Sequence, residues 1–133
     1  MRFESLFQQR FAEVFAEFGM KEGDYGLLVA LRRAGAPYEL TPTELAKARM
    51  MSSGELTPAL DRLHRRGWIE RAPNPEDRRG MLVRLTGAGR ELIYAAMDAH
   101  IAAEHDLVRH LSPTKQRQLV TLLRELLVSV GGA

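Results

Sequence analysis

The sequence predicts a mainly α-helical fold with one small β-hairpin, and three observations lead to this prediction. Apolar residues recur at helical spacing along most of the chain. Turn residues and alternating apolar positions mark the stretch PNPEDRRGMLVRL, residues 73–85, as part of a hairpin. The chain has 133 residues, 45% of them hydrophobic and 27% charged, so we expect a single domain over residues 1–133 with a core of its own.

The first helix is expected at about residues 3–18. All five phenylalanines of the chain fall in this segment, and their spacing of three or four residues places them in one apolar stripe. Aromatic side chains bury a large area, so the stripe must pack on its own domain, on another chain, or on both. The stripe consists of Phe3, Phe7, Phe11, Phe15 and Phe18.

A second helix is expected at residues 24–34, followed by a short extended piece and a short helix at residues 42–48. The start of the short helix is well marked. Thr41 offers a capping hydroxyl, Pro42 occupies the first helical position, where no N–H is needed, and Glu44 completes a capping box.

The next helix should begin after a turn that contains Met50 and Met51, which we expect to fill the gap between the two helices. Ser53 is its expected cap, and Gly67 its expected C-terminal stop. Pro58 lies inside this helix and removes a hydrogen bond, so the first turn should be irregular or the regular helix should start later. The buried face carries Leu56, Leu60 and Leu63.

Two short strands are expected at residues 68–71 and 81–85, with Arg78, Arg79 and Gly80 at the tip of the hairpin between them. A long helix at about residues 88–110 and a last helix from Ser112 to Val130 complete the chain. The last helix has a wider apolar face than one side of a small domain requires, which indicates a second surface to cover.

A short helix, a tight turn, a leucine-faced helix and a two-stranded hairpin form, in this order, a winged helix-turn-helix. Seven arginines fall between Arg62 and Arg84, against three carboxylates, and such a basic stripe favours a polyanionic partner over a solvated face. The second helix of such a unit fits the major groove of DNA, and arginines on the hairpin reach the minor groove. The alternative is a protein-interaction module whose basic face binds an acidic partner.

The sequence resembles the MarR family of bacterial transcriptional regulators. The segment from Asp77 to Thr86, DRRGMLVRLT, followed by Gly89, matches the family's wing, and LTPTELA and LDRLHRRGWIER match its two helix-turn-helix segments in the right order. The resemblance implies a homodimeric, double-stranded-DNA-binding regulator that binds a pseudo-palindromic operator and acts as a repressor. It implies a DNA-binding lobe at about residues 24–86 and dimerisation helices at about 1–20 and 88–133.

The segments expected to contact DNA are the second helix of the motif and the wing. This helix departs from the family pattern, because we expect an amide or basic side chain near Pro58 or Ala59 and there is none. Hydrogen-bond readout then rests on few side chains, and specificity leans on DNA shape and the wing. The expected DNA contacts are Ser53, Gly54, Glu55, Thr57, Pro58, Arg62, Arg65, Arg78 and Arg79.

Two acidic residues are expected to support the wing rather than contact DNA. Asp61 lies on a DNA-facing helix, where a carboxylate repels phosphate, so it should hold a wing arginine; Asp77 is expected to do the same from the hairpin. The family also commonly binds a small aromatic or phenolic effector. Its pocket would be drawn from Phe11, Phe15, Phe18, Tyr25, Tyr38 and Arg32 or Arg33, unless these aromatic residues are simply dimer core.

The sequence also argues against several classes of function. There is no cysteine, which excludes disulfides and thiol chemistry. The histidines at 100, 105 and 110 are spaced by five residues, so neighbours sit about 140° apart on a helix and a metal site within one chain is not expected. We expect no cofactor and no enzymatic activity, because no phosphate loop, carboxylate pair or nucleophile motif is present. No secretory or membrane-spanning pattern is found, so a cytoplasmic protein is expected.

Overall fold

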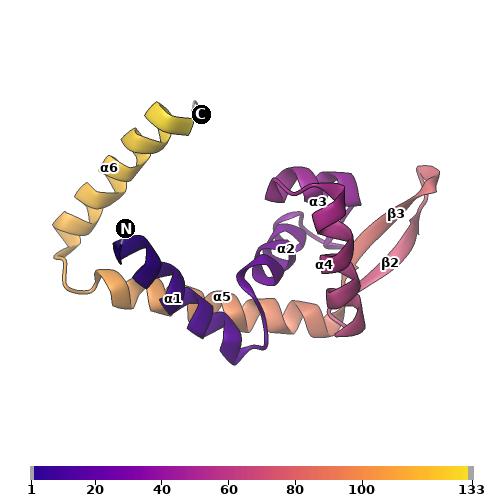
Figure 1. Cartoon of the computed structure of the whole chain (residues 1–133), viewed down its shortest axis with the longest axis horizontal. Coiled ribbons are helices and arrows are strands. Elements are labelled where there is room, and N and C mark those ends of the chain that lie inside the picture. The colour runs from indigo at the N-terminus through magenta and orange to yellow at the C-terminus, as the bar shows by residue number, and fades with distance from the viewer. Residues whose placement is uncertain (1, 132–133) are drawn as a thin grey trace. The chain divides into compact units, whose positions relative to one another are not determined.

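A computed structural model describes residues 2–131 and, within them, the side chains of residues 5–130. The side chain of Phe3, in the phenylalanine stripe, and the outermost residues of the two expected dimerisation segments lie outside the described part. The chain divides into two compact units, Met1–His100 and Ile101–Ala133. Figure 1 labels the elements. Their order is α1 (Arg2–Glu17), α2 (Glu22–Arg33), β1 (Glu39–Leu40), α3 (Pro42–Arg49), α4 (Ser53–Arg65), β2 (Ile69–Asn74), β3 (Asp77–Leu85), α5 (Gly87–Val108) and α6 (Pro113–Gly131).

The core of the first unit is aliphatic and is centred on α2. Leu27, Leu28 and Leu31 of this helix are completely buried. Buried apolar side chains from α3, α4, the sheet and α5 join them in the core. Because these side chains are removed from water together, they hold the four elements around α2. These side chains are Leu45, Leu63, Ile69, Val83 and Ile93.

The start of α3 is the one the sequence predicts. Thr41 caps the helix, since its hydroxyl accepts a hydrogen bond from the Glu44 amide at 3.1 Å. The Glu44 carboxylate in turn accepts hydrogen bonds from the Thr41 amide and hydroxyl. The helix ends at Met50, which adopts the left-handed conformation with φ +53°. Met50 is 94% exposed, so the expectation that it fills the gap between α3 and α4 is wrong.

The start of α4 differs from the prediction by one residue. Ser52, not Ser53, is the cap, because its hydroxyl accepts a hydrogen bond from the Glu55 amide at 3.2 Å. The Glu55 carboxylate in turn accepts hydrogen bonds from the Ser52 amide and hydroxyl. The helix is continuous through Pro58, so the expected irregular first turn is also wrong. Proline at this position removes only the bond to the carbonyl of exposed Gly54, which water can satisfy.

The end of α4 is a Schellman motif. Gly67 has φ +76°, its amide donates to the His64 carbonyl at 3.0 Å, and the Trp68 amide donates to the Leu63 carbonyl at 3.1 Å. The left-handed conformation at Gly67 turns the chain directly from α4 into β2, as the sequence predicts.

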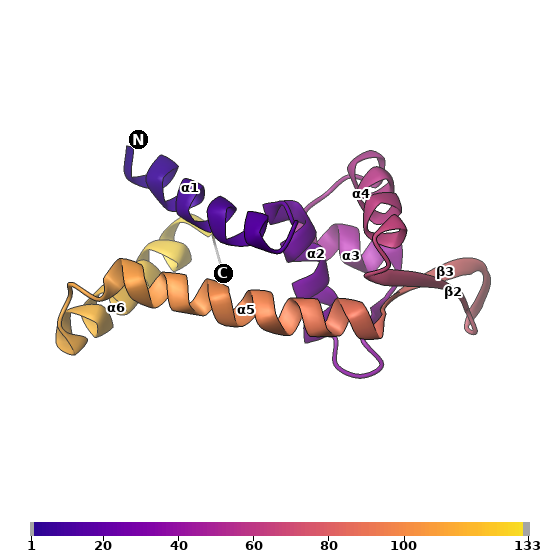
Figure 2. The same ribbon diagram turned by 90° about the horizontal axis from the view of Figure 1, so that it is seen from below.

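The three strands form one antiparallel sheet in the order β1-β3-β2. Figures 1 and 2 show the β2–β3 hairpin projecting beyond α4. Both strands are longer than predicted, and the turn lies at Pro75 and Glu76 rather than at the arginines. Pro73 pairs with Met81 and Asn74 pairs with Asp77, so residues 78–80 form a bulge on β3 just after the turn.

The base of the wing is fastened to the beginning of α5. The Thr86 hydroxyl donates to the Gly67 carbonyl at 2.6 Å and accepts from the Gly89 amide at 3.0 Å, and the Thr86 amide donates to the Trp68 carbonyl. Gly89 is buried, and a Cβ added there would collide with the Trp68 carbonyl oxygen. Glycine is therefore required for α5 to approach the strand so closely.

The second unit contains the C-terminal end of α5 and the whole of α6. Ser112 caps α6 through the Lys115 amide, and the Gln116 side chain donates to the carbonyls of Val108 and Leu111, which fixes the turn between the helices. Large apolar side chains of α6 are 47–79% exposed to solvent. They are Val120, Leu122, Leu123, Leu126, Leu127, Val128 and Val130.

Candidate nucleic-acid interface

The N-terminal half of α4 and the hairpin lie at the same end of the first unit (Figures 1 and 2). Most residues that the sequence analysis assigned to DNA contact are exposed there. In the N-terminal half of α4 they are Ser53, Gly54, Glu55, Thr57 and Pro58, and on the wing they are Arg78 and Arg79. Arg65 is also exposed, but it is the last residue of α4 and lies at the opposite end of the helix.

Several polar side chains at the start of α4 are bound to the helix itself. The Glu55 carboxylate accepts from both the amide and the hydroxyl of Ser52. The Thr57 hydroxyl donates to the Ser53 carbonyl at 3.1 Å. These contacts fix the side chains but reduce the number of groups that point to a partner.

The Arg62 side chain, which the sequence analysis expected to contact DNA, is bound to a carboxylate of the protein itself. Its Nε and Nη2 atoms both donate to Oδ1 of Asp24, at 3.1 and 2.6 Å, and the side chain of Asp24 is only 2% exposed. The other carboxylate oxygen accepts from the Lys21 amide at 3.1 Å. Withdrawing Arg62 to reach DNA would leave a buried carboxylate without its counter-charge, so the interaction seen here is one that joins α4 to α2.

The wing is supported by ion pairs on its two strands. Asp61 of α4 accepts from Nη2 of Arg71 on β2 at 2.6 Å, so the wing arginine it holds is Arg71. Arg84, in the middle strand, donates from Nε and Nη2 to Glu39 on β1, and its Nη1 lies 3.6 Å from Glu70 on β2. The hydrogen bond and the negative charge of Glu39 raise the pKa of Arg84 above its ordinary value, so it remains a cation that crosslinks the three strands.

The bulge near the tip is held by short polar side chains. Asp77 accepts from the Arg79 amide and Asn74 accepts from the Glu76 amide, each at 3.0 Å. Gly80 lies beside Asp77 and Asn74, so that an added Cβ would come within 3.3–3.4 Å of them. The Asp77 side chain thus supports the wing by binding the backbone amide of Arg79. The side chains of Arg78 and Arg79 stay exposed.

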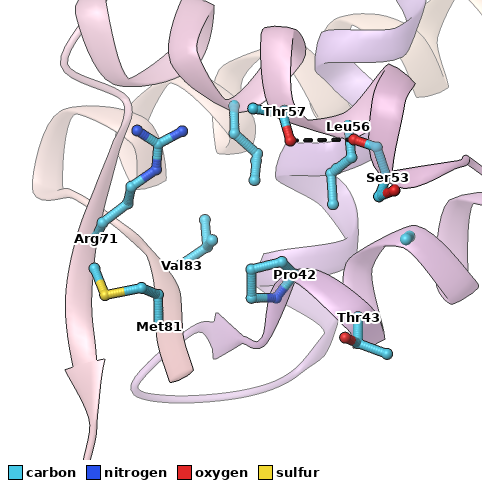
Figure 3. A pocket seen from close by; sticks show the side chains of 10 residues that line it. Pro42, Thr43, Ser53, Leu56, Thr57, Arg71, Met81 and Val83 are labelled. Carbon is cyan, nitrogen blue, oxygen red and sulfur yellow. Dashed lines mark hydrogen bonds between the residues drawn. The ribbon is translucent and has the colours of Figure 1, made fainter. Parts of the chain in front are cut away.

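A cavity of about 380 Å³ lies between α3, α4 and the hairpin. Figure 3 shows Pro42 and Thr57 on the side of the helices and Arg71 and Met81 on the side of the hairpin. Its wall is mainly apolar, with one guanidinium and a few hydroxyls. The lining residues are Pro42, Thr43, Ala46, Ser53, Leu56, Thr57, Leu60, Arg71, Met81 and Val83.

The residues expected to line an effector pocket make several contacts with other side chains of the same chain. Phe15 stacks on Tyr25 with centroids 4.3 Å apart, and Phe11 lies 4.5 Å from the His100 ring, so these rings pack on one another. The remaining members have other surroundings. Arg32 covers Tyr94 at 4.2 Å, Tyr38 lies 5.7 Å from the guanidinium of Arg90, and Phe18 is half-buried at the end of α1.

Sequence analysis missed Asp24, Arg71 and His100. Asp24 has the position of an ordinary helix-start carboxylate, and nothing local shows that its partner is 38 residues away. Arg71 was read only as part of a basic stripe. His100 was weighed as a metal ligand, whereas it completes an aromatic cluster; among the described residues, no group of three potential ligands could hold a metal ion. Likewise, no helix within residues 2–131 is long and apolar enough to cross a membrane.

Comparison with known proteins supports the same assignment. The model of the MarR family matches residues 18–80. The regulator PecS of Dickeya dadantii is 33% identical over 122 residues, which are 92% of this chain and 74% of PecS. A MarR variant from E. coli complexed with operator DNA has 30% identity and a TM-score of 0.78, covering 93% of this chain and 87% of that one. A MarR family transcriptional regulator from Streptomyces coelicolor in complex with DNA has 29% identity and a TM-score of 0.79, covering 96% and 80%. The chain therefore belongs to the MarR family of DNA-binding transcriptional regulators.

Proposed function

We propose that this protein is a homodimeric repressor that binds a pseudo-palindromic operator and is released by a small aromatic effector. The observation that carries the proposal is that the wing, with two exposed arginines, and the exposed N-terminal half of α4 lie at one end of the same unit. A helix of this kind enters the major groove while the wing reaches the neighbouring minor groove. The role is non-catalytic, and we place it in the cytoplasm.

The dimer is supported by the apolar side chains of α6. Leu126 and Leu127 are 59% and 66% exposed, and their helix carries five further exposed large apolar residues. A soluble protein rarely leaves such a surface in water, and a second copy of the chain would cover it. Two lobes would then bind half-sites about 34–36 Å apart, one helical turn of DNA.

The effector is assigned to the cavity between the helix-turn-helix and the wing. Its volume of about 380 Å³ is within the range of small-molecule sites. The apolar wall suits an aromatic ring, and Arg71 offers a cation for a carboxylate or phenolate. Because Arg71 also pairs with Asp61, an anion bound there would compete for the contact that holds the wing to α4.

The test is fluorescence-anisotropy binding to duplexes tiled across the DNA upstream of the protein's own gene. We expect one duplex to bind at nanomolar affinity, and the affinity to fall by about 10³–10⁵ between 50 and 200 mM salt if six to ten phosphates are contacted. The variant Arg78→Ala/Arg79→Ala should lose most of this affinity, while Arg33→Ala, at an exposed site at the end of α2, should not. Equal, weak binding to every duplex would reject a specific operator.

Aromatic carboxylates and phenols are then tested for release of the bound duplex. Release by wild type and its loss in Arg71→Gln would support the effector site. An aromatic acid that releases Arg71→Gln equally well binds elsewhere.

A further inference from the structure

The charged side chains Asp61 and Arg62 of α4 form ion pairs with other parts of the protein, which changes how this helix can recognise DNA. Arg62 is bound to Asp24, and Asp61 is bound to Arg71. At the start of the helix, Glu55 is bound to its cap residue Ser52. A base-reading helix ordinarily offers arginine, asparagine or glutamine to the purines. Here residues 53–60 contain none of these types.

Two exposed apolar residues stand at the same end of the helix. Pro58 is exposed in the second turn of α4. Met50, in the turn just before α4, is 94% exposed, more than any other large apolar side chain of the described residues. The N-terminal end of the second helix is the part that meets base edges in a helix-turn-helix.

Met50 is unfavourable in the free protein for two reasons. Its thioether chain is almost wholly in water, and its backbone has φ +53°, a conformation for which glycine or asparagine is the usual choice. We interpret the exposed side chain and the left-handed backbone of Met50 as features that are compensated by a contact with DNA.

We propose that Pro58 and Met50 read the 5-methyl groups of thymines in the major groove, so that the helix recognises its half-site by apolar contact. The thymine methyl is the one apolar group on the major-groove edge of a base pair, and it distinguishes T·A from C·G. Affinity comes from the cations of the wing, while sequence preference on α4 comes from these methyl groups. The inference rests on the DNA-binding function, and it adds which chemical group of the operator the helix recognises.

The experiment begins with duplexes selected from a random pool by the full-length protein. The selected half-sites should share T·A pairs at fixed positions. Each shared thymine is then replaced by uracil, which removes only the methyl group and keeps the hydrogen-bonding pattern. We expect affinity to fall about fourfold for each contacted methyl, the factor for exposing one buried methyl group. Uracil placed outside the shared positions is the matched control on the DNA.

Protein variants show which residue meets which methyl. Pro58→Ala and Met50→Ala should each bind the thymine duplex about fourfold more weakly, and should show no further loss at the uracil position that they contact. Met50→Asn is the folding control, because asparagine tolerates the left-handed conformation while removing the apolar side chain. It should melt as wild type does and bind like Met50→Ala.

The outcomes separate this inference from the DNA-binding function itself. If no duplex is enriched, sequence-specific binding is rejected. If a duplex is enriched and bound tightly but uracil changes nothing, DNA binding stands and methyl recognition is overturned. Equal losses of the variants on thymine and uracil duplexes would also overturn it, since they would place Pro58 and Met50 against the sugar-phosphate backbone.

Discussion

Arg62 of α4 donates two hydrogen bonds to Oδ1 of Asp24, a carboxylate buried at the beginning of α2. This pair joins α4, the helix that we propose contacts DNA, to the helix at the centre of the core. The orientation of α4 in the lobe therefore depends on an interaction with α2.

The first prediction concerns what Arg62 does. Arg62→Ala leaves Asp24 buried without a counter-charge, which costs about 3–5 kcal/mol in a fully buried pair. Because the Arg62 side chain is 34% exposed, we expect a smaller loss of roughly 2–3 kcal/mol in the free energy of unfolding. Urea unfolding at fixed protein concentration measures it.

The matched variant is Asp24→Asn, which keeps a hydrogen-bond acceptor and removes the buried charge, so it should lose less stability than Arg62→Ala. A stable Arg62→Ala protein whose DNA binding has a shallower salt dependence would instead make Arg62 a phosphate contact.

The second prediction concerns the pair of Asp61 and Arg71. Both side chains are about a third to a half exposed, so Asp61→Ala should cost at most about 1 kcal/mol of stability. Its effect on DNA binding should be larger, because the wing loses a contact to α4. A double-mutant cycle with Arg71→Ala, read by operator affinity, should show coupling between the two residues. Additive losses would mean that the pair does not position the wing.

Local signals in the sequence predicted the elements well, and long-range partners could not be predicted. The Thr41 cap, Gly67 and the order of helices and strands depend on residues close together in the chain, so their patterns are visible in the sequence. The prediction of Ser53 as the cap of α4 is wrong by one residue, because both positions are serine and only the Ser52 hydroxyl meets the Glu55 amide.

The candidate site was predicted in part for the same reason. Exposure of the α4 residues and of the wing arginines follows from helical periodicity and from charge. The partner of Arg62 does not follow from such local signals, because Arg62 binds a buried carboxylate that lies 38 residues away in the chain. The cavity beside Arg71 is formed by two helices and a hairpin, and no single segment carries its pattern.

The third prediction concerns the second surface of the chain. Leu126→Asp or Leu127→Asp places a charge within the apolar row of α6, and a dimer that buries this row should dissociate because the carboxylate would have to be desolvated. Multi-angle light scattering should give half the wild-type mass. Gln118→Asp, an exposed polar position on the same helix, is the control and should keep the wild-type mass. Unchanged mass in both leucine variants would place the dimer contact elsewhere.

The fourth prediction concerns the junction between the wing and α5. Gly89→Ala adds a methyl group that would collide with the Trp68 carbonyl oxygen, which is backbone and cannot move aside alone. We expect a loss of about 1–3 kcal/mol in the free energy of unfolding, the range for overpacking a buried site. Gly87→Ala is the matched control, since the nearest atom to its added methyl is the end of the flexible Arg90 side chain at 3.9 Å. At that helix-starting position alanine should be neutral or stabilise by up to about 1 kcal/mol. Equal melting of the two variants would show that α5 can move away from the strand without cost, and the wing would then not be fixed at its base.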